Sequence, residues 1–208
     1  MAGRFITLEG LDGAGKSTQL DAVRDWLAER GVDALFTREP GGTPLGERLR
    51  ELLLSPDTEV GLDAETLLMF AARQEHLDRV IRPALAAGRW VVCDRFTDAT
   101  FAYQGGGRGV PFERIAVLEQ WVQRGLSPDL TLLFDLSTEL AAARMAVSRA
   151  LDRFEREARD FHERVRGAYL ARAAAEPARF AVFDASQPPE AVRAAVQARL
   201  AELVGADR

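Results

Sequence analysis

The stretch Gly10-Leu11-Asp12-Gly13-Ala14-Gly15-Lys16-Ser17 decides the fold of this chain. It fits the pattern G-x-x-x-x-G-K-[ST], in which backbone N–H groups turn inward around phosphates and a helix begins directly afterwards. The apolar run Phe5–Leu8 precedes it, and a helical pattern starts at Lys16. Because spacing and context both match, the sequence favours a phosphate-binding loop over a glycine-rich turn without a ligand.

The loop assigns chemistry to individual residues. Lys16 is expected to reach the outer phosphates, and the Ser17 hydroxyl is expected to contact the Mg²⁺ that bridges them. Lys16 is also the only lysine among 27 basic residues. A general preference for arginine is the ordinary explanation, and the alternative is that a planar guanidinium cannot replace a compact ammonium at this position. The residues expected to bind the nucleotide through this loop are Gly10, Leu11, Asp12, Gly13, Ala14, Gly15, Lys16, Ser17 and Thr18.

Outward from the loop, strand and helix signals alternate along the chain. Short apolar runs predict buried parallel strands at Phe5–Leu8, Ala34–Thr37, Trp90–Cys93, Leu130–Phe134 and Phe180–Phe183. Helical patterns lie between them at residues 16–30, 45–54, 63–87, 112–124, 138–176 with a break, and 190–203. The alternation predicts one α/β domain over residues 1–208, with a five-stranded, mostly parallel sheet between helical layers. The glycine stretches 41–42 and 105–107 predict loops inside this domain.

Composition narrows the classes of partner and compartment. The chain has 208 residues, of which 47% are apolar, so it can bury a sizeable core. Its formal net charge of −5 argues against general attraction to nucleic acid or to an anionic membrane. The single cysteine, Cys93, excludes a disulfide framework and is expected to be a small buried hydrophobe. With no targeting or membrane-spanning segment apparent, a cytoplasmic protein is expected.

Two absences separate this chain from other nucleotide-binding classes. It contains no asparagine, so it lacks the Asn-Lys-x-Asp element that reads guanine in GTPases. Asp94 is followed by Arg95 and not by the catalytic glutamate that is usual in motor ATPases. Both observations favour a phosphotransferase whose nucleophile comes from a second substrate. A nucleotide-dependent switch protein that hydrolyses ATP without an acceptor remains the alternative from another class.

Three clusters at strand ends and in one helix carry a resemblance to a known family. They are Thr37-Arg38-Glu39-Pro40-Gly41-Gly42-Thr43, Met69-Phe70-Ala71-Ala72-Arg73, and Asp94-Arg95-Phe96 with Ala102-Tyr103-Gln104-Gly105. Together with the loop, they make the chain resemble bacterial thymidylate kinase from Phe5 to Pro188. The resemblance implies a three-layer P-loop NTPase fold, phosphorylation of dTMP to dTDP with ATP and Mg²⁺, and a homodimer. Another nucleoside monophosphate kinase is the alternative within the same chemistry.

Arginine side chains are expected to bind the phosphate of the acceptor nucleotide, because a guanidinium group binds phosphate through paired donors. Arg38, Arg50 and Arg95 lie in or near these clusters and suit that role, with Glu39 in the same predicted site. A structural salt bridge is the ordinary alternative for each arginine taken singly. Asp94 closes an apolar strand and, with Ser17, forms the expected metal site.

The base and sugar are assigned mainly through the resemblance. Phe70 and Arg73 lie three residues apart on one helical face, and the family stacks an aromatic ring on thymine while this arginine donates to a base carbonyl. Many relatives place the aromatic residue one position earlier, where this chain has Met69, so the register stays open. By analogy Thr100 and Gln104 lie at the base edge, Tyr103 crowds the position of a ribose hydroxyl, and Asp12 lies near the acceptor sugar.

A lid is expected around residues 144–156. The four variable positions of the loop carry no basic residue, and in this family that pattern accompanies catalytic arginines in a lid. Arg149 and Arg153 match, with Arg153 the firmer match; a solvated helix with ordinary ion pairs is the alternative. Together, the residues expected to take part in catalysis are Lys16, Arg95, Arg149 and Arg153. Gln187 is expected to lie beside the adenine of ATP.

Overall fold

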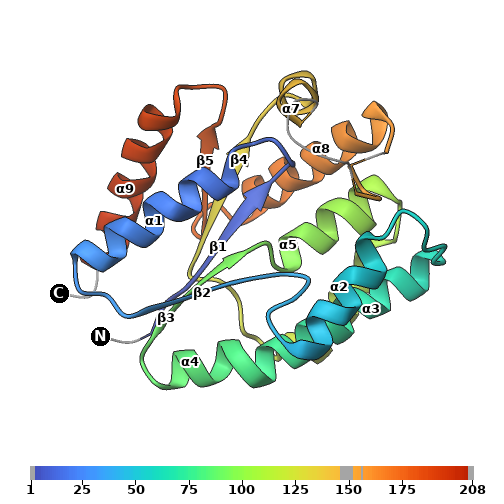
Figure 1. Ribbon diagram of the computed structural model, residues 1–208, viewed down its shortest axis with the longest axis horizontal. Helices are drawn as coiled ribbons and strands as arrows, with labels where there is room; N and C mark the ends of the chain where they lie inside the picture. Colours follow the sequence, from blue (N-terminus) through green and yellow to red (C-terminus); the bar gives the residue numbers. More distant parts are fainter. Residues whose placement is uncertain (1–2, 146–151, 156, 206–208) are drawn as a thin grey trace.

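Five parallel strands form the sheet of the computed structural model, in the order β2-β3-β1-β4-β5 (Figure 1). The structure describes residues 3–145, 152–155 and 157–205. The strands are β1 (Phe5–Gly10), β2 (Ala34–Arg38), β3 (Trp90–Asp94), β4 (Leu130–Asp135) and β5 (Phe180–Asp184). All five predicted strands are confirmed, and each continues slightly further at its carboxyl end.

Side chains alternate along the strands between two apolar clusters. Ile6 and Leu8 of β1 enter a cluster with α1 and α9, whereas Phe5 enters a second cluster with α3 and α6. Phe5 is in register with Val91 of β3, which belongs to the same second cluster. Since both faces of the sheet are covered, its strands are near-continuous apolar runs, which explains why they could be recognised in the sequence.

The helices flank the sheet on both sides (Figure 1). Two of them, α1 (Lys16–Glu29) and α9 (Pro189–Gly205), lie against each other. At the start of α2 the Thr43 hydroxyl accepts a hydrogen bond from Gly46 N at 2.9 Å, the usual cap at a helix start. The other helices are α2 (Pro44–Leu54), α3 (Leu62–His76), α4 (Arg82–Ala86), α5 (Thr97–Thr100), α6 (Phe112–Gln123), α7 (Thr138–Met145) and α8 (Arg159–Ala175), with π-helical turns η1 (Leu77–Ile81) and η2 (Phe101–Gly107).

The helix predicted over residues 63–87 is observed from Leu62 to Ala86, but it changes type along its length. It runs through α3, the π-helical turn η1 and α4. Pro83 lies near the start of α4 and has no N–H to donate. The wider turn just before Pro83 lets the chain continue as a helix past that missing bond.

The prediction of a loop at Gly105–Gly107 was wrong. These glycines form the end of η2, which packs against α8. A Cβ on Gly106 would lie 2.6 Å from the Cβ of Ala168, and one on Gly107 would lie 2.4 Å from the Phe161 ring. The glycines therefore permit close helix packing. Gly41 and Gly42, in contrast, form a loop with positive φ angles of 140° and 77°, as predicted.

No helix in the part of the chain that the structure describes is long and apolar enough to cross a membrane.

Candidate active site

The phosphate-binding loop wraps around the Lys16 ammonium. Lys16 Nζ donates to the carbonyl oxygens of Gly10 at 3.0 Å and Leu11 at 2.9 Å, and the side chain is buried. Gly13 and Gly15 have φ angles of 82° and 85°, which favour glycine. A Cβ on Gly13 would also lie 2.6 Å from the carbonyl oxygen of Ala141. The predicted loop is thus formed, with its lysine held inside the turn.

Lys16 lies near groups of both charges, the Arg95 guanidinium and the Asp12 carboxylate. Burial and the positive charge of Arg95 lower the pKa of Lys16. Burial alone would raise the pKa of Asp12, but the charges of Arg95 and Lys16 overcome it and hold that pKa well below its usual range. Asp12 is therefore ionised, with Lys16 Nζ 3.6 Å from its Oδ1.

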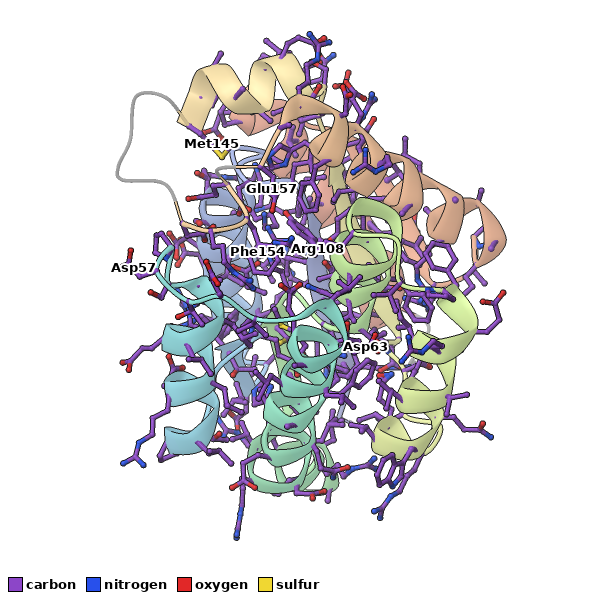
Figure 2. The ribbon with its side chains drawn as sticks, turned by 90° about the vertical axis from the view of Figure 1, so that its right-hand side faces the viewer. Asp57, Asp63, Arg108, Met145, Phe154 and Glu157 are labelled. Carbon is purple, nitrogen blue, oxygen red and sulfur yellow. The ribbon has the colours of Figure 1, made fainter. Side chains whose placement is uncertain are left out.

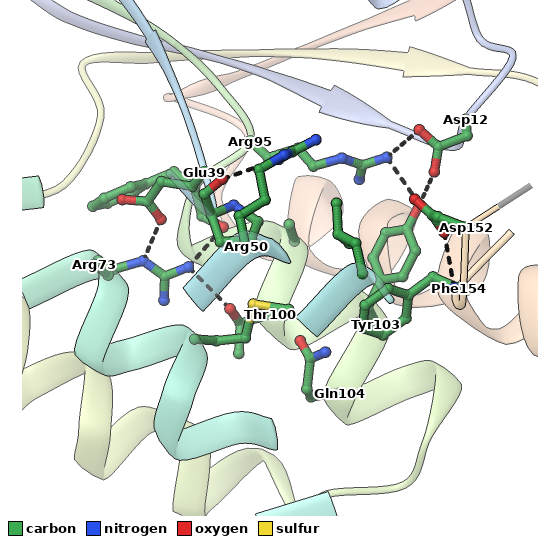
Figure 3. A pocket seen from close by; sticks show the side chains of 15 residues that line it. Asp12, Glu39, Arg50, Arg73, Arg95, Thr100, Tyr103, Gln104, Asp152 and Phe154 are labelled. Atoms are coloured by element: carbon green, nitrogen blue, oxygen red, sulfur yellow. Dashed lines mark hydrogen bonds and ion pairs between the residues drawn. The ribbon is translucent and has the colours of Figure 1, made fainter. Parts of the chain in front are cut away.

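A pocket opens beside this loop at the carboxyl ends of β2 and β3 (Figure 3). The space between these side chains, including the open mouth of the pocket, is about 680 Å³. Residues from the phosphate-binding loop, the strand ends and the surrounding helices all contribute to it. They are Asp12, Glu39, Pro40, Arg50, Leu54, Met69, Arg73, Arg95, Phe96, Ala99, Thr100, Tyr103, Gln104, Asp152 and Phe154.

Arg95 joins the pocket to the phosphate-binding loop. Its Nη2 donates to Asp12 Oδ1 at 2.8 Å and to the Tyr103 hydroxyl at 3.0 Å (Figure 3). The Tyr103 hydroxyl in turn donates to Asp12 Oδ2 at 3.2 Å. Arg95 has a φ of 68°, a left-handed conformation unusual for a residue with a side chain. Such strain is typical of a position whose side chain has a required direction.

A second support holds Arg95 from behind. Arg95 Nη1 donates to the Tyr169 hydroxyl at 3.2 Å, and that hydroxyl donates to Glu9 Oε2 at 2.7 Å. The other oxygen of Glu9 accepts from Phe96 N at 2.7 Å. Burial, with the nearby charge of Asp98, raises the pKa of Glu9 to about 8. The sequence offered no signal for Glu9 or Tyr169.

Two further arginines flank the phosphate end of the pocket. Arg50 lines it and donates to the carbonyl oxygen of Pro40 at 3.0 Å. Burial lowers the pKa of Arg50, and the positive charges of Arg38 and Arg95 lower it further. Arg38 is half-exposed, donates to Glu47 at 2.8 Å and is not among the lining residues. The structure therefore brings Arg50 and Arg95 together but leaves Arg38 at the rim.

The far end of the pocket is built around Arg73. Its Nε donates to Glu39 at 2.7 Å, and its Nη2 donates to Thr100 Oγ1 at 3.0 Å and to the carbonyl oxygen of Phe96 at 3.2 Å. Arg73 Nη1 is buried and has no hydrogen-bond partner among the described residues. An unpaired buried donor is unfavourable, and a carbonyl group on a ligand would satisfy it.

The structure corrects the prediction that Phe70 faces the ligand. Phe70 is buried in the second apolar cluster, and the Arg73 guanidinium lies 4.7 Å from its ring centroid. Met69 lines the pocket instead. Adjacent helix residues differ by about 100° in direction, so a shift of one position moves a side chain from pocket to core.

Glu39 is fixed by a second partner, the imidazole of His76. His76 is fully buried, with its Nδ1 3.0 Å from Glu39 and its Nε2 2.7 Å from the Thr37 hydroxyl. This chain of bonds holds Glu39, and through it Arg73, against the end of β2. A histidine in an apolar helix pattern gives no indication of such a role.

The lid segment is described only in part. Arg149 lies outside the described residues. Arg153 donates to Glu65 at 2.6 Å and to the carbonyl oxygen of Leu53 at 3.0 Å, so in this structure its guanidinium contacts α2 and α3 and is not brought to the phosphate-binding loop. Its neighbours Asp152 and Phe154 line the pocket.

The expected metal site offers oxygen donors from Asp94 and Ser17. Asp94 Oδ1 is buried and has no hydrogen-bond partner among the described residues, and Ser17 is exposed in the first turn of α1. A carboxylate and a hydroxyl are hard oxygen ligands of the kind Mg²⁺ takes, usually with several waters. In the described ranges no group of three or more His, Cys, Asp or Glu side chains is arranged to hold a metal. The residues present fit a cation completed by phosphate and water.

The nucleotide side shows one arginine that the sequence analysis missed. Arg144 donates to the carbonyl oxygens of Gly13 at 3.3 Å and Ala185 at 3.0 Å, tying the phosphate-binding loop to the turn after β5. Gln187 lies in that turn, exposed, and donates to Asp184 at 2.8 Å. Leu11 and Ala14 are buried in the core, so only their backbone groups can serve a ligand. In a chain with this many arginines, nothing singles out Arg144.

Comparison with known proteins gives one consistent family. The family model for thymidylate kinase matches residues 8–196. The thymidylate kinase of Chromobacterium violaceum is 67% identical over 202 residues, covering 97% of this chain and 95% of that protein. The thymidylate kinase of Neisseria gonorrhoeae is 59% identical over 197 residues, covering 95% and 96%. A crystal structure of thymidylate kinase from Ehrlichia chaffeensis superposes with a TM-score of 0.78 at 33% identity, covering 96% and 99%.

Proposed function

The chain belongs to the thymidylate kinase family, and on that premise we propose how its residues carry out the phosphorylation of dTMP by ATP. An oxygen of the dTMP phosphate attacks the γ-phosphorus of ATP, the bond from that phosphorus to the bridging oxygen breaks, and dTDP and ADP leave. A phosphate monoester has a second pKa of about 6, so the attacking oxygen is already anionic and needs no general base. The protein's task is to position two anions and to neutralise their charge.

The observation that carries this proposal is the Arg95 bridge. One guanidinium lines the acceptor pocket and also bonds Asp12 of the phosphate-binding loop at 2.8 Å. A monophosphate held by Arg95 and Arg50 would therefore face the phosphates held by the loop. Burial is the largest cause of the lowered pKa values of Lys16 and Arg50, and a bound phosphate would compensate the charge of both groups.

We assign the phosphate groups as follows. Lys16 and the loop N–H groups hold the transferred phosphoryl group, Arg95 and Arg50 hold the acceptor phosphate, and Arg38 approaches it from the rim. Lys16 also stabilises the charge that develops on the leaving ADP. Arg149, in the undescribed part of the lid, and Gln187, beside the adenine, keep the roles predicted for them.

At the other end, Arg73 and Thr100 contact the base, with Gln104 completing its edge. Tyr103 lies against the sugar, where it excludes a 2′-hydroxyl by crowding. Met69 replaces Phe70 as the side chain against the base, while Glu39 holds Arg73. Asp12 accepts from the sugar side of the acceptor.

Mg²⁺ would be held by the Ser17 hydroxyl and the Asp94 carboxylate. When bound it supplies positive charge to the phosphate oxygens. The orphaned Asp94 Oδ1 supports this assignment. Neither residue is needed to deprotonate the acceptor.

We further propose that the enzyme is a homodimer of single-domain subunits spanning residues 1–208, each with a lid over residues 144–156, and that it works in the cytoplasm. Helices α2, α3 and α6 run side by side on one face (Figure 2). That face carries most of the large exposed apolar side chains among the described residues: Leu45, Leu52, Leu67, Phe112, Val117 and Trp121. Such a surface fits a second copy of the same chain.

A panel of acceptors with Mg-ATP tests the reaction. dTMP should support ADP release at a rate far above UMP, CMP, AMP and GMP, with dTDP formed in equal amount. Preference for another monophosphate would assign a different kinase. ADP release without a phosphorylated acceptor would instead favour a nucleotide-dependent switch.

A further inference from the structure

Glu65 in α3 is a buried carboxylate without a role in the reaction as assigned above. It is 1% exposed, and three donors surround it. Gln104 Nε2 donates to its Oε1 at 2.9 Å, and Arg153 Nη2 donates to its Oε2 at 2.6 Å. Arg108 Nε lies 3.1 Å from its Oε1 as an ion pair. Burying a carboxylate is costly unless it is paired and hydrogen-bonded, as Glu65 is by these three side chains.

We propose that Glu65 is a positioning residue that fixes the amide of Gln104, so that the pocket accepts a pyrimidine dione and rejects an aminopyrimidine. The inference rests on the proposed function, because it concerns the acceptor of that reaction. The inference adds Glu65 as the residue that determines whether the oxygen or the nitrogen of the Gln104 amide faces the base.

An amide side chain is ambiguous because its oxygen and its nitrogen are nearly the same size. Which of them faces a ligand is set by the partner on the other side. A carboxylate flanked by two guanidinium groups accepts hydrogen bonds and donates none. It therefore draws the nitrogen of Gln104 towards itself and leaves the oxygen for the pocket. Figure 3 shows this oxygen on the side facing Thr100.

The resulting pattern matches one class of base. A pyrimidine dione presents a ring N–H donor next to a carbonyl acceptor, and Gln104 Oε1 and Arg73 supply the complementary acceptor and donor. In an aminopyrimidine the ring nitrogen is an acceptor and the neighbouring group is a donor. Both contacts are then mismatched in a buried site, which is how sites built on hydrogen bonds discriminate strongly.

The same carboxylate also holds one wall of the pocket. Arg153 is anchored by Glu65 and by the carbonyl oxygen of Leu53, and the next residue, Phe154, lines the pocket with its ring edge-on to Tyr103 at 5.9 Å. Phe154 and Arg108 lie side by side (Figure 2), with the Arg108 guanidinium 5.2 Å from the centroid of the Phe154 ring. In this arrangement Arg153 serves base recognition through Glu65.

The test compares two substitutions in the same helix. Glu65→Gln replaces the carboxylate by a group that both donates and accepts, so Gln104 can present either side. Asp63→Asn is the matched control, since Asp63 forms an exposed pair with Arg114 at 2.9 Å, away from the pocket. The measurement is kcat/KM for dTMP divided by kcat/KM for dCMP, with ATP in excess.

We expect Glu65→Gln to lower this ratio at least tenfold, through a higher KM for dTMP and a gain with dCMP, while Asp63→Asn stays within twofold of wild type. An equal loss on both substrates would show a merely structural role and overturn the inference. A wild-type protein that does not phosphorylate dTMP would overturn the proposed function instead.

A second measurement uses the wild-type protein, in case Glu65→Gln does not fold. In a crystal of the complex with dTMP, the Gln104 amide should lie within hydrogen-bond distance of both Glu65 and the ring N–H of the base. A Gln104 side chain that contacts Glu65 but not the base would overturn the inference.

Discussion

Lys16 is the residue whose chemical identity the structure explains most fully. Its ammonium is buried and donates to two carbonyl oxygens inside a turn of the phosphate-binding loop. A guanidinium is larger and planar, so it cannot enter this turn without opening it. The other 26 basic residues are arginines, so Lys16 is the one position of the sequence where the basic group is an ammonium.

We therefore expect the Lys16→Arg variant to lose most of its activity although the substitution keeps the positive charge. Turnover should fall by about 10²- to 10³-fold, the usual loss when one preorganised donor to a transition state is removed. The measurement is a coupled ADP-release assay with saturating dTMP, with thermal unfolding to confirm that the fold persists. Near wild-type turnover would show that positive charge alone suffices at this position.

Glu9 makes a prediction about pH and stability. Its pKa is raised from 4.5 to about 8 by burial, so the folded protein keeps a proton that the unfolded chain releases above pH 4.5. The unfolded state then binds fewer protons between those two values, and the free energy of unfolding falls as the pH rises from about 4.5 to 8. The loss from this one group is on the order of a few kcal/mol.

Glu9→Gln mimics the protonated acid and does not titrate. Its unfolding free energy should therefore decline less than that of wild type between pH 6 and pH 9, as measured by urea denaturation at both values. Above pH 8 the variant should be the more stable of the two proteins. Parallel declines in the two proteins would mean that Glu9 is ionised in the fold at pH 6.

At the scale of elements, the strands were predictable and the helix around η2 was not. Strands covered on both faces are near-continuous apolar runs, so Trp90–Cys93 and Leu130–Phe134 stand out locally. Gly105–Gly107 indicated a loop, because the reason for those glycines is a helix that is distant in sequence and close in space. Local patterns contain no trace of that neighbour.

The residues of the site likewise fall into those that local motifs predict and those that depend on contacts between distant parts of the chain. Asp12, Lys16 and Arg95 follow from motifs whose geometry is local, and the structure brings them together. Glu65 and His76 were missed, because a charged or polar residue in a helix is usually solvated. The prediction for the residue that faces the base was wrong by one position, since Met69 lines the pocket and Phe70 is in the core. The sequence pattern predicted the helix but not the direction in which each of its side chains points.

Gly106 allows the packing of η2 against α8 to be tested. A methyl group there would lie 2.6 Å from Ala168 Cβ and 2.9 Å from the carbonyl oxygen of Arg164, which is backbone and cannot move aside. We expect Gly106→Ala to lower the unfolding free energy by about 1–3 kcal/mol through overpacking. Because η2 carries Tyr103 and Gln104, the KM for dTMP should rise as well.

Gly167→Ala is the control for that substitution. Gly167 lies in α8, exposed, with nothing within 4 Å of an added Cβ. Alanine there should raise stability by up to about 1 kcal/mol, the difference in helix propensity. Thermal denaturation of both variants gives the comparison. A neutral Gly106→Ala would mean that α8 is free to move away from η2.

At the scale of the whole molecule, an acidic protein binds two anionic substrates. The net charge of −5 gives no long-range attraction for them. Attraction is instead local: Lys16, Arg50 and Arg95 converge where the sheet ends, and burial strengthens each of their interactions. Binding should therefore depend less on salt than it would for a generally basic protein.

The face formed by α2, α3 and α6 carries the last prediction. Trp121 is 70% exposed and Val117 is 64% exposed, one turn apart on α6, and Leu67 of the neighbouring α3 is 54% exposed. Trp121→Glu places a charge at the centre of this apolar surface and should convert a dimer into a monomer, as measured by light scattering at micromolar concentration. Leu140→Glu changes an equally apolar, 45% exposed residue on α7, outside that face, and should leave the dimer intact. Because the lining residues Leu54 and Met69 belong to α2 and α3, the monomeric variant should also show a raised KM for dTMP. A wild-type protein with the mass of one chain would refute the dimer, whereas loss of the dimer in both variants would place the interface elsewhere.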